Sequence, residues 1–280
     1  MRIDECLSDY SGVFFDAAEL IASVQSPYQL IEVFDTPDLG KLMRIDGANM
    51  VAERDEFFYH ENLIHPAAIA HPAPRQVLIV GGGDGGSAEE MLKDPTVESL
   101  QLCELDAVVV DIAKQHFQSV HRNVFADPRL TLQVGDGLQY LRETSARFDL
   151  IYLDLTDPIG AAASLYTPTF YADCKRALAV GGAMTMHIGS PFSHPQRVRR
   201  SVEDLRAVFK QVAVWFVHIP LYGATWGFAC ASDALDLHTI RSEEIDARLA
   251  ARKVGDRQYY EGKMHHAMLS LPPYIRALIA

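Results

Sequence analysis

The sequence predicts an α/β fold in which a mostly parallel sheet follows a small N-terminal β-strand domain. Three observations support this prediction. The chain has 280 residues, which suits one large domain with an appendage or two modest domains. Its first 73 residues consist largely of short segments that mix apolar and polar residues. From Gln76 onward, strand-like and helix-like segments alternate, as in a parallel sheet that is covered on both faces.

The first region, residues 1–73, is predicted to form antiparallel hairpins. Its segments are interrupted by Pro, Asp and Gly, which turns favour: "YQLIEVFDT" (28–36), "GKLMRIDG" (40–47) and "ANMVAERDE" (48–56). The stretch "HPAPR" (71–75) is predicted to connect it to the second region, residues 74–280.

The second region is predicted to alternate strands and helices. The expected strands cover residues 76–80, 99–105, 130–136, 148–155 and 182–188, with closing strands at 211–219 and 225–232. The expected helices cover residues 87–94, 107–117, 137–143, 168–180 and 196–209. The tail from Leu235 is charged and helical, and the more apolar "MLSLPPYIRALIA" follows it.

The net charge of −12 argues against a nucleic-acid partner, because phosphates require a basic surface. It is compatible with a cationic substrate, although ordinary acidic solubility explains it as well. No apolar run approaches the length of a membrane span, and the acidic start "MRIDECLSDY" does not resemble an export signal. The four cysteines show no C-x-x-C pair, so we expect a reduced, cytoplasmic setting.

A glycine-rich turn, "VLIVGGGDGG" (77–86), joins the first strand of the second region to its first helix. Glycines there allow a tight turn and let the backbone approach a ligand closely. The turn contains Asp84, whose carboxylate would repel a pyrophosphate and attract an amine or a sulfonium. The turn therefore favours an adenosylmethionine-type ligand over a dinucleotide.

Acidic residues also follow the next strands. Glu104 stands where an acid accepts hydrogen bonds from ribose hydroxyls, and Asp136 could accept from an adenine amine. Asp154 and Asp157 end the strand in "FDLIYLDLTDPIG" (148–160). Each acid alone could serve a turn or a helix cap. Together they should gather at one carboxyl edge of the sheet, which predicts a site for a cationic ligand.

These residues resemble the polyamine aminopropyltransferases, typified by spermidine synthase. The motifs that carry the resemblance are "YQ" (28–29), "DG" (46–47), "ERDEFFYHE" (53–61), "VLIVGGGDGG" (77–86), "CELD" (103–106), "VGDG" (134–137), "DLTDPIG" (154–160), "IPLYG" (219–223) and "LSLPPYI" (269–275). The resemblance implies a Rossmann-like catalytic domain of the class I methyltransferase type and a homodimer or homotetramer. It also implies transfer of an aminopropyl group from decarboxylated S-adenosylmethionine, a co-substrate rather than a bound cofactor, to a di- or polyamine.

The resemblance assigns roles to individual residues. Gln29, Glu104, Asp136 and Gly137 would hold the nucleoside, and Asp84 would bind the amine of the aminopropyl arm. Asp154 would accept the proton of the attacking amine, with help from Tyr59. The polyamine path would be lined by His60, Asp157, Tyr222 and His187. We expect no metal, because the histidines of "HENLIH" (60–65) are five residues apart instead of the four of H-E-x-x-H.

The chain departs from the family pattern at several positions, which indicates an altered acceptor pocket. Met50, Glu89, Ala161, Ala163, His187 and Gly189 replace the family's usual Gln, Arg, Pro, Glu, Gln and Glu. Putrescine is the acceptor that the resemblance favours, giving spermidine and methylthioadenosine. Two alternatives stay open: an S-adenosylmethionine-dependent methyltransferase, and a polyamine- or nucleoside-binding protein without turnover. Asp84 favours aminopropyl transfer, because ordinary S-adenosylmethionine would bring a carboxylate against it.

Overall fold

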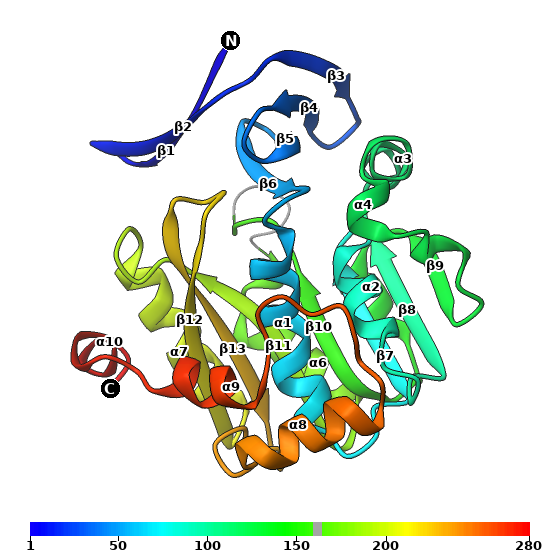
Figure 1. The fold of residues 1–280 in the computed structure, drawn as a ribbon. Helices are drawn as coiled ribbons and strands as arrows, with labels where there is room; N and C mark the ends of the chain where they lie inside the picture. Colours follow the sequence, from blue (N-terminus) through cyan, green and yellow to red (C-terminus); the bar gives the residue numbers. More distant parts are fainter. Residues whose placement is uncertain (159–163) are drawn as a thin grey trace.

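The computed structural model describes residues 1–158 and 164–280 (Figure 1). In these residues the strands form a two-stranded hairpin, a four-stranded sheet and a seven-stranded sheet. The N-terminal sheet lies over the carboxyl ends of the central strands of the seven-stranded sheet, and the helices flank the latter (Figure 1). None of the helices in the described ranges has the length and apolarity that a membrane span requires.

The N-terminal strands are antiparallel throughout. The hairpin contains β1 (Arg2–Ser8) and β2 (Ser11–Asp16), and the four-stranded sheet contains β3 (Glu19–Gln25), β4 (Leu30–Thr36), β5 (Gly40–Ile45) and β6 (Ala48–Ala52). Asp46 and Gly47 connect β5 to β6, and both have positive φ values, as a two-residue Asp-Gly hairpin turn requires. The predicted antiparallel N-terminal β domain is confirmed.

The seven-stranded sheet has the order β12-β13-β11-β10-β7-β8-β9. Its strands are β7 (Gln76–Gly81), β8 (Ser99–Glu104), β9 (Leu130–Val134), β10 (Phe148–Asp154), β11 (Leu178–Gly189), β12 (Gln211–Ile219) and β13 (Ala224–Ser232). The pairs from β9 through to β11 are parallel, whereas β13 pairs antiparallel with β11 and β12. The chain runs outward from β7 to β9 and then returns to β10 on the other side of β7. Ligands of open α/β sheets bind at such a reversal of strand order.

The helices are α1 (Glu56–Ala70), α2 (Gly86–Leu92), α3 (Ala107–His116), α4 (Gln118–His121), the 3-10 turn η1 (Val124–Ala126), α5 (Gly137–Glu143), α6 (Pro168–Ala177), α7 (Pro195–Val208), α8 (Ser242–Ala251), α9 (Gly262–Leu269) and α10 (Pro273–Leu278). Side chains of β10 alternate between two apolar cores, because successive residues of a strand face opposite sides of the sheet. Leu150 and Tyr152 belong to the core under α1, α2, α8 and α9, and Ile151 and Leu153 to the core under α5, α6 and α7.

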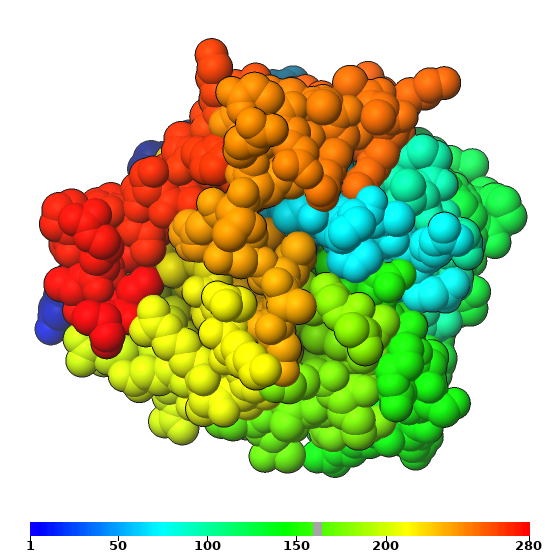
Figure 2. Space-filling view, turned by 90° about the horizontal axis from the view of Figure 1, so that it is seen from below, coloured from blue at the N-terminus to red at the C-terminus, as the bar shows by residue number. Residues whose placement is uncertain are grey.

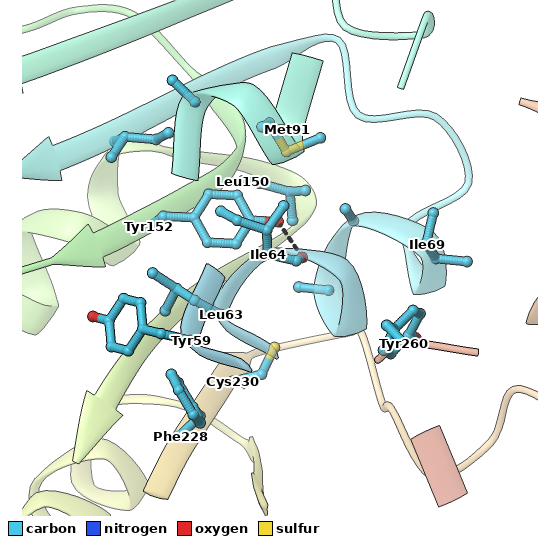
Figure 3. Close-up of a cluster of buried hydrophobic side chains, with 14 of the residues drawn as sticks. Tyr59, Leu63, Ile64, Ile69, Met91, Leu150, Tyr152, Phe228, Cys230 and Tyr260 are labelled. Atoms are coloured by element: carbon cyan, nitrogen blue, oxygen red, sulfur yellow. Dashed lines mark hydrogen bonds between the residues drawn. The ribbon is translucent and has the colours of Figure 1, made fainter. Parts of the chain in front are cut away.

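Helix α1 is the largest element that the sequence analysis did not predict. All but two of its fifteen residues are buried, so its sequence shows no polar face to mark it as a surface helix. The hydroxyl of Tyr152 donates a hydrogen bond to the carbonyl of Ile64 over 2.9 Å, at the centre of a cluster that joins α1 to the sheet (Figure 3). The helix precedes residue 73 and packs on the seven-stranded sheet. The division of the chain at residues 73–74 stays a prediction.

The C-terminal tail covers the end of α1. In Figure 2 the orange segment that contains α8 lies against the cyan segment around residue 70. The guanidinium of Arg248 donates to the carbonyls of Ile69 and Ala70, and that of Arg252 donates to the carbonyl of Ala68. The predicted helical tail is therefore part of the shell around this core.

Most predicted boundaries in the second region agree with the structure to within two residues, and the largest difference lies between α6 and β11. The helix expected over 168–180 ends at Ala177, and β11 begins at Leu178. Leu178 pairs with Phe148 of β10, so its backbone is extended despite the helical pattern around it. Pairing along a neighbouring strand overrides the local helix propensity of these three residues.

Candidate active site

A cavity of about 620 Å³ lies at the carboxyl ends of β7, β8 and β10, under the N-terminal sheet. Its lining includes all of the predicted site residues except His187: Gln29, Tyr59, His60, Asp84, Glu104, Asp136, Gly137, Asp154, Asp157 and Tyr222. These residues come from the ends of β8 and β10, from α1, from the first residue of α5 and from five loops. The strand-end acids that the sequence analysis singled out therefore meet at one place.

The glycine turn allows β7 and β10 to end side by side. Gly81 and Gly82 have φ values of 83° and 69°, which L side chains rarely adopt. The amide of Gly82 donates to the carbonyl of Asp154 over 2.9 Å, and a Cβ at Gly81 would lie 1.9 Å from that oxygen. The turn therefore brings Asp84 to the same corner of the cavity as Asp154.

His60, Asp84 and Asp154 form the centre of the site. One side-chain atom from each lies within 4.8 Å of the others. The Nε2 atom of His60 is 3.6 Å from Oδ2 of Asp84, and its Nδ1 atom is 2.6 Å from Oε2 of Glu56. Burial would lower the pKa of His60, but the two carboxylates raise it well above its ordinary value. His60 is thus a buried cation between two acids.

The two aspartates have opposite pKa shifts. Burial would raise the pKa of Asp84, but the charge and hydrogen bond of His60 lower it below its usual value. Burial and the charge of Asp84 raise the pKa of Asp154 to about 6. Oδ2 of Asp154 is buried and has no hydrogen-bond partner among the described residues. A buried carboxylate oxygen without a partner is a position for a ligand's hydrogen-bond donor.

Tyr59 approaches Asp154 from α1. Its ring packs in the buried cluster, and its hydroxyl points away from Leu63 and Phe228 (Figure 3). The hydroxyl lies close enough to Asp154 to lower the pKa of that carboxyl, and burial keeps the phenol itself protonated. Tyr59 can therefore donate a hydrogen bond at the site.

A metal ion could find three ligands in His60, Asp84 and Asp154. A histidine must lose its proton to bind a metal, and the raised pKa of His60 opposes that loss. The two histidines of "HENLIH" have different partners, since Nε2 of His65 is 2.9 Å from Oε2 of Glu90. The expected absence of a metal stays a prediction.

The predicted nucleoside residues line the other end of the cavity. Glu104 accepts hydrogen bonds from the amides of Gly83 and Asp106, and burial raises its pKa to about 7. Asp136 caps α5 by accepting from the amide of Leu138 over 2.8 Å. The side-chain amide of Gln29 donates to Oδ2 of Asp106 over 3.1 Å. Glu104 thus serves a turn and Asp136 a helix cap, and both acids also line the cavity.

The predicted amine residues differ in their surroundings. Oδ2 of Asp157 is 2.7 Å from Nη1 of Arg197, so this carboxylate is already paired. The hydroxyl of Tyr222 donates to the main-chain oxygen of Met50 over 3.0 Å. Met50, one of the departures from the family pattern, thus contacts the site through its backbone as well as lining the cavity.

His187 is not among the residues that line the cavity, and its place on the polyamine path stays a prediction. Its ring is only 2% exposed, and Nε2 donates to the carbonyl of Leu155 over 2.8 Å and lies 2.7 Å from the hydroxyl of Tyr166. That hydroxyl donates in turn to the carbonyl of Thr156. Burial and the charge of Arg197 lower the pKa of His187 to about 4. His187 is a neutral side chain that supports the loop between Asp154 and Asp157.

Comparison with known proteins identifies the family. A family model described as the spermine/spermidine synthase domain matches residues 56–241. The chain belongs to this family. It is 46% identical over 276 residues to the polyamine aminopropyltransferase of Nitrosomonas europaea, covering 99% of this chain and 85% of that protein. It is 33% identical over 280 residues to polyamine aminopropyltransferase 2 of Hyperthermus butylicus, covering 99% of this chain and 92% of that protein.

Solved structures support the same assignment. A crystal structure of spermidine synthase in complex with the transition-state analogue AdoDATO superposes with a TM-score of 0.93 at 32% identity, covering all of this chain and 94% of that one. Spermidine synthase from Thermotoga maritima gives a TM-score of 0.92 at 32% identity with the same coverage. The predicted Rossmann-like fold and the predicted family are confirmed. The chain is an aminopropyltransferase enzyme of polyamine biosynthesis.

The remaining positions at which this aminopropyltransferase departs from the family pattern lie in different parts of the structure. Glu89 pairs with Lys93 and Arg122 on α2 and beside it, outside the cavity lining. Gly189 has a φ of 85°, and a Cβ there would lie 3.2 Å from Cζ of Arg197. Ala161 and Ala163 lie outside the described residues.

Three charged residues of the site were not predicted. Asp55 lines the cavity, accepts from the amide of Leu221 over 2.7 Å, and has its pKa raised to about 6 by burial. Glu56 orients His60 from one helical turn away. Both belong to the motif "ERDEFFYHE", which also contains Tyr59, so their closeness to a predicted site residue could have indicated them. Arg197 gave no signal, because it lies forty residues beyond its partner in an ordinary surface-helix pattern.

Proposed function

We propose that this aminopropyltransferase transfers the aminopropyl group of decarboxylated S-adenosylmethionine to putrescine, giving spermidine and methylthioadenosine. The observation that carries the proposal is the pair of partly buried aspartates, Asp84 and Asp154, in a cavity large enough for a nucleoside and an amine. Oδ2 of Asp154 has no partner among the described residues, so a substrate nitrogen can donate to it.

The nucleoside end of the donor fits the lining around Glu104. Its carboxylate would accept from the ribose hydroxyls, and Asp136 from the exocyclic amine of adenine, with Gln29 and Gly137 beside them. Asp84 would bind the ammonium of the aminopropyl arm. Because the pKa of Asp84 is lowered, its carboxylate is ionised at neutral pH and favours this cation.

Asp84 also supports discrimination between donors. Ordinary S-adenosylmethionine carries a carboxylate beside its amine, and that group would meet the anionic Asp84. Asp84→Asn should therefore narrow the difference in affinity between the two donors. Calorimetric titration of both donors measures it, and an unchanged ratio would count against this role of Asp84.

The transfer forms one C–N bond and breaks one C–S bond. The lone pair of the amine attacks the methylene carbon next to the sulfonium, and the C–S electron pair leaves on sulfur as a neutral thioether. No acid needs to protonate this leaving group. The attacking nitrogen must lose a proton, and Asp154 receives it while Tyr59 donates to the carboxylate.

The raised pKa of Asp154 suits this proton transfer. A free aspartate, with a pKa of about 3.9, is a weak base toward an ammonium whose pKa is near 10 by analogy with lysine. A pKa of about 6 brings the basicity of Asp154 closer to that of the amine and leaves the carboxylate ionised at neutral pH. The cation of His60 offsets the repulsion between Asp154 and Asp84 before the substrates bind.

The test is an acceptor panel. The enzyme is incubated with decarboxylated S-adenosylmethionine and diamines or triamines of increasing length, and methylthioadenosine is measured by chromatography. We expect product with putrescine above the longer acceptors. Absence of methylthioadenosine with every acceptor would refute the proposal, and a preference for another amine would correct the acceptor. Formation of a methylated amine from ordinary S-adenosylmethionine would favour the methyltransferase alternative.

We also propose a homodimer or homotetramer that works in the cytoplasm. The resemblance to the family supports the assembly, and the four free cysteines are consistent with a reduced compartment. Light scattering at several protein concentrations would distinguish these assemblies from a monomer.

A further inference from the structure

The ion pair between Asp157 and Arg197 sits beside the cavity. Asp157 lines the cavity wall, and Arg197 projects from α7 to place Nη1 2.7 Å from its Oδ2. Burial would raise the pKa of Asp157, but the hydrogen bond and charge of Arg197 lower it. Asp157 is therefore ionised, and its charge is balanced by a fixed cation.

The guanidinium of Arg197 is held in place and is not free to leave for solvent. Its side chain is 17% exposed, and its Cζ atom lies 5.7 Å from the centre of the Tyr166 ring. Nε and Nη2 are buried without partners in the described part of the chain, and Asp157 is the one carboxylate there with which Arg197 forms an ion pair. A Cβ at Gly189 would press on Cζ, so the glycine leaves room for this guanidinium.

The surroundings of Asp154 and of Asp157 in the cavity consequently differ in charge. Asp84 and Asp154 stand together with one buried cation, His60, and Asp154 keeps an unpartnered oxygen. At Asp157 the carboxylate and the guanidinium form a neutral pair. A second ammonium that approaches Asp157 would be attracted by the carboxylate and repelled by the guanidinium that is paired with it.

We propose that Arg197 is a specificity-determining residue for the acceptor amine, because it neutralises the anchor that Asp157 would offer to a second ammonium. This inference rests on the proposed aminopropyl transfer to an amine. The enzyme then binds the reacting nitrogen through the charge of Asp154. A second charge at the far end of the acceptor adds little to the affinity. It discriminates weakly between a diamine and a monoamine of the same chain length.

The test compares 1,4-diaminobutane with butylamine in the wild type and in variants of Arg197. In the wild type we expect the two values of kcat/KM to lie within about tenfold of each other. Arg197→Met and Arg197→Gln both remove the guanidinium charge, and each should raise the preference for the diamine by about tenfold or more through its KM. Butylamine should be unaffected. Using both variants separates the loss of charge from a packing defect of either side chain.

Two controls accompany these variants. Arg197→Lys keeps the charge and should retain the wild-type ratio. Arg200→Met removes a charge from the same helix, where Arg200 is 81% exposed and pairs with Asp204, and should leave the ratio unchanged. Adding Asp157→Asn to Arg197→Met should abolish the gain, because the gain depends on the freed carboxylate. An unchanged ratio in both Arg197→Met and Arg197→Gln overturns the inference, and so does a strong diamine preference in the wild type.

A binding measurement separates this inference from the proposed function. The affinities of both amines for the complex of the enzyme with methylthioadenosine are measured by calorimetry, which requires no turnover. If no amine gives methylthioadenosine as a product in the turnover assay, the proposed function is refuted. The ratio of the two binding affinities would still decide the role of Arg197. If neither amine binds to the wild type or to Arg197→Met, the inference is overturned as well.

Discussion

The Nε2 atom of His60 lies 3.6 Å from Oδ2 of Asp84, and this ion pair allows a second carboxylate, Asp154, to lie in the same site. Asp84 and Asp154 offer oxygens within 4.8 Å of each other, so each carboxylate disfavours ionisation of the other. The imidazolium of His60 offsets this repulsion from one side, and Glu56 fixes the ring from the other. The arrangement keeps both aspartates available for cationic substrates.

The stability that His60 contributes should depend on pH. Its folded-state pKa is raised above the ordinary value of 6.5, so its contribution is fully present below pH 6.5 and is lost as pH rises toward the folded-state pKa. The difference in unfolding free energy between wild type and His60→Gln should shrink above pH 6.5 by roughly 1.4 kcal/mol per pH unit until that pKa is reached. Urea unfolding at pH 6 to 9 measures it. His238→Gln, at an exposed position, is the control, and a difference that grows with pH would contradict the prediction.

Asp154→Asn should reduce kcat by about 10²- to 10⁴-fold, because the attacking amine loses its proton acceptor. Donor affinity should change by less than about threefold, since the donor's amine is assigned to Asp84. Single-turnover kinetics and calorimetry with decarboxylated S-adenosylmethionine separate the two effects. Asp204→Asn on the surface of α7 is the matched control. An Asp154→Asn enzyme with full activity would rule out a proton-accepting role.

The pH profile of kcat/KM should show the raised pKa of Asp154. Activity should increase as pH rises through about 6, because Asp154 must be ionised to accept a proton. His60→Gln removes the cation that lowers the pKa of Asp154, so this limb of the profile should move to higher pH. A limb at the same pH in both enzymes would show that another group controls it.

His187→Ala should raise the KM for the acceptor about five- to twentyfold and leave donor affinity unchanged. The variant loses the contacts of the imidazole with the carbonyl of Leu155 and the hydroxyl of Tyr166. These contacts support the loop that carries Asp157. The pH profile should keep its shape, because a pKa of about 4 leaves His187 neutral throughout the assay range. A shifted profile would indicate direct participation. His218→Ala, on the exposed side of β12, controls for the loss of a histidine.

Glu61→Gln should destabilise the protein by about 2–3 kcal/mol. Glu61 is fully buried on α1 and accepts hydrogen bonds from the amides of Gln258, Tyr259 and Tyr260 over 2.6, 3.0 and 2.7 Å. A glutamine would turn an NH₂ group toward at least one of these donors. Chemical denaturation measures the loss, with the exposed Glu243→Gln as control. Equal stability of the two variants would show that the tail does not depend on this carboxylate.

Much of the site could be predicted because its acids follow strands directly in sequence. Asp84, Glu104, Asp136 and Asp154 each stand at or just after the end of a strand whose apolar run is visible, and parallel strands bring such ends to one edge. His187 stands near the end of β11, as the sequence predicts. Its contacts with the hydroxyl of Tyr166 and the carbonyl of Leu155 depend on packing, which the sequence does not show.

The sequence by itself determined the alternation of strands and helices from residue 76 onward, the glycine turn, the gathering of carboxylates and the family, since these depend on local periodicity and short motifs. Only the tertiary structure decided that α1 is a buried helix, that Glu61 holds the tail, and that Arg197 neutralises Asp157. Each of these depends on which distant residue becomes a neighbour. A periodic pattern indicates the face that is buried, but the partner on that face is chosen by the packing of the whole chain.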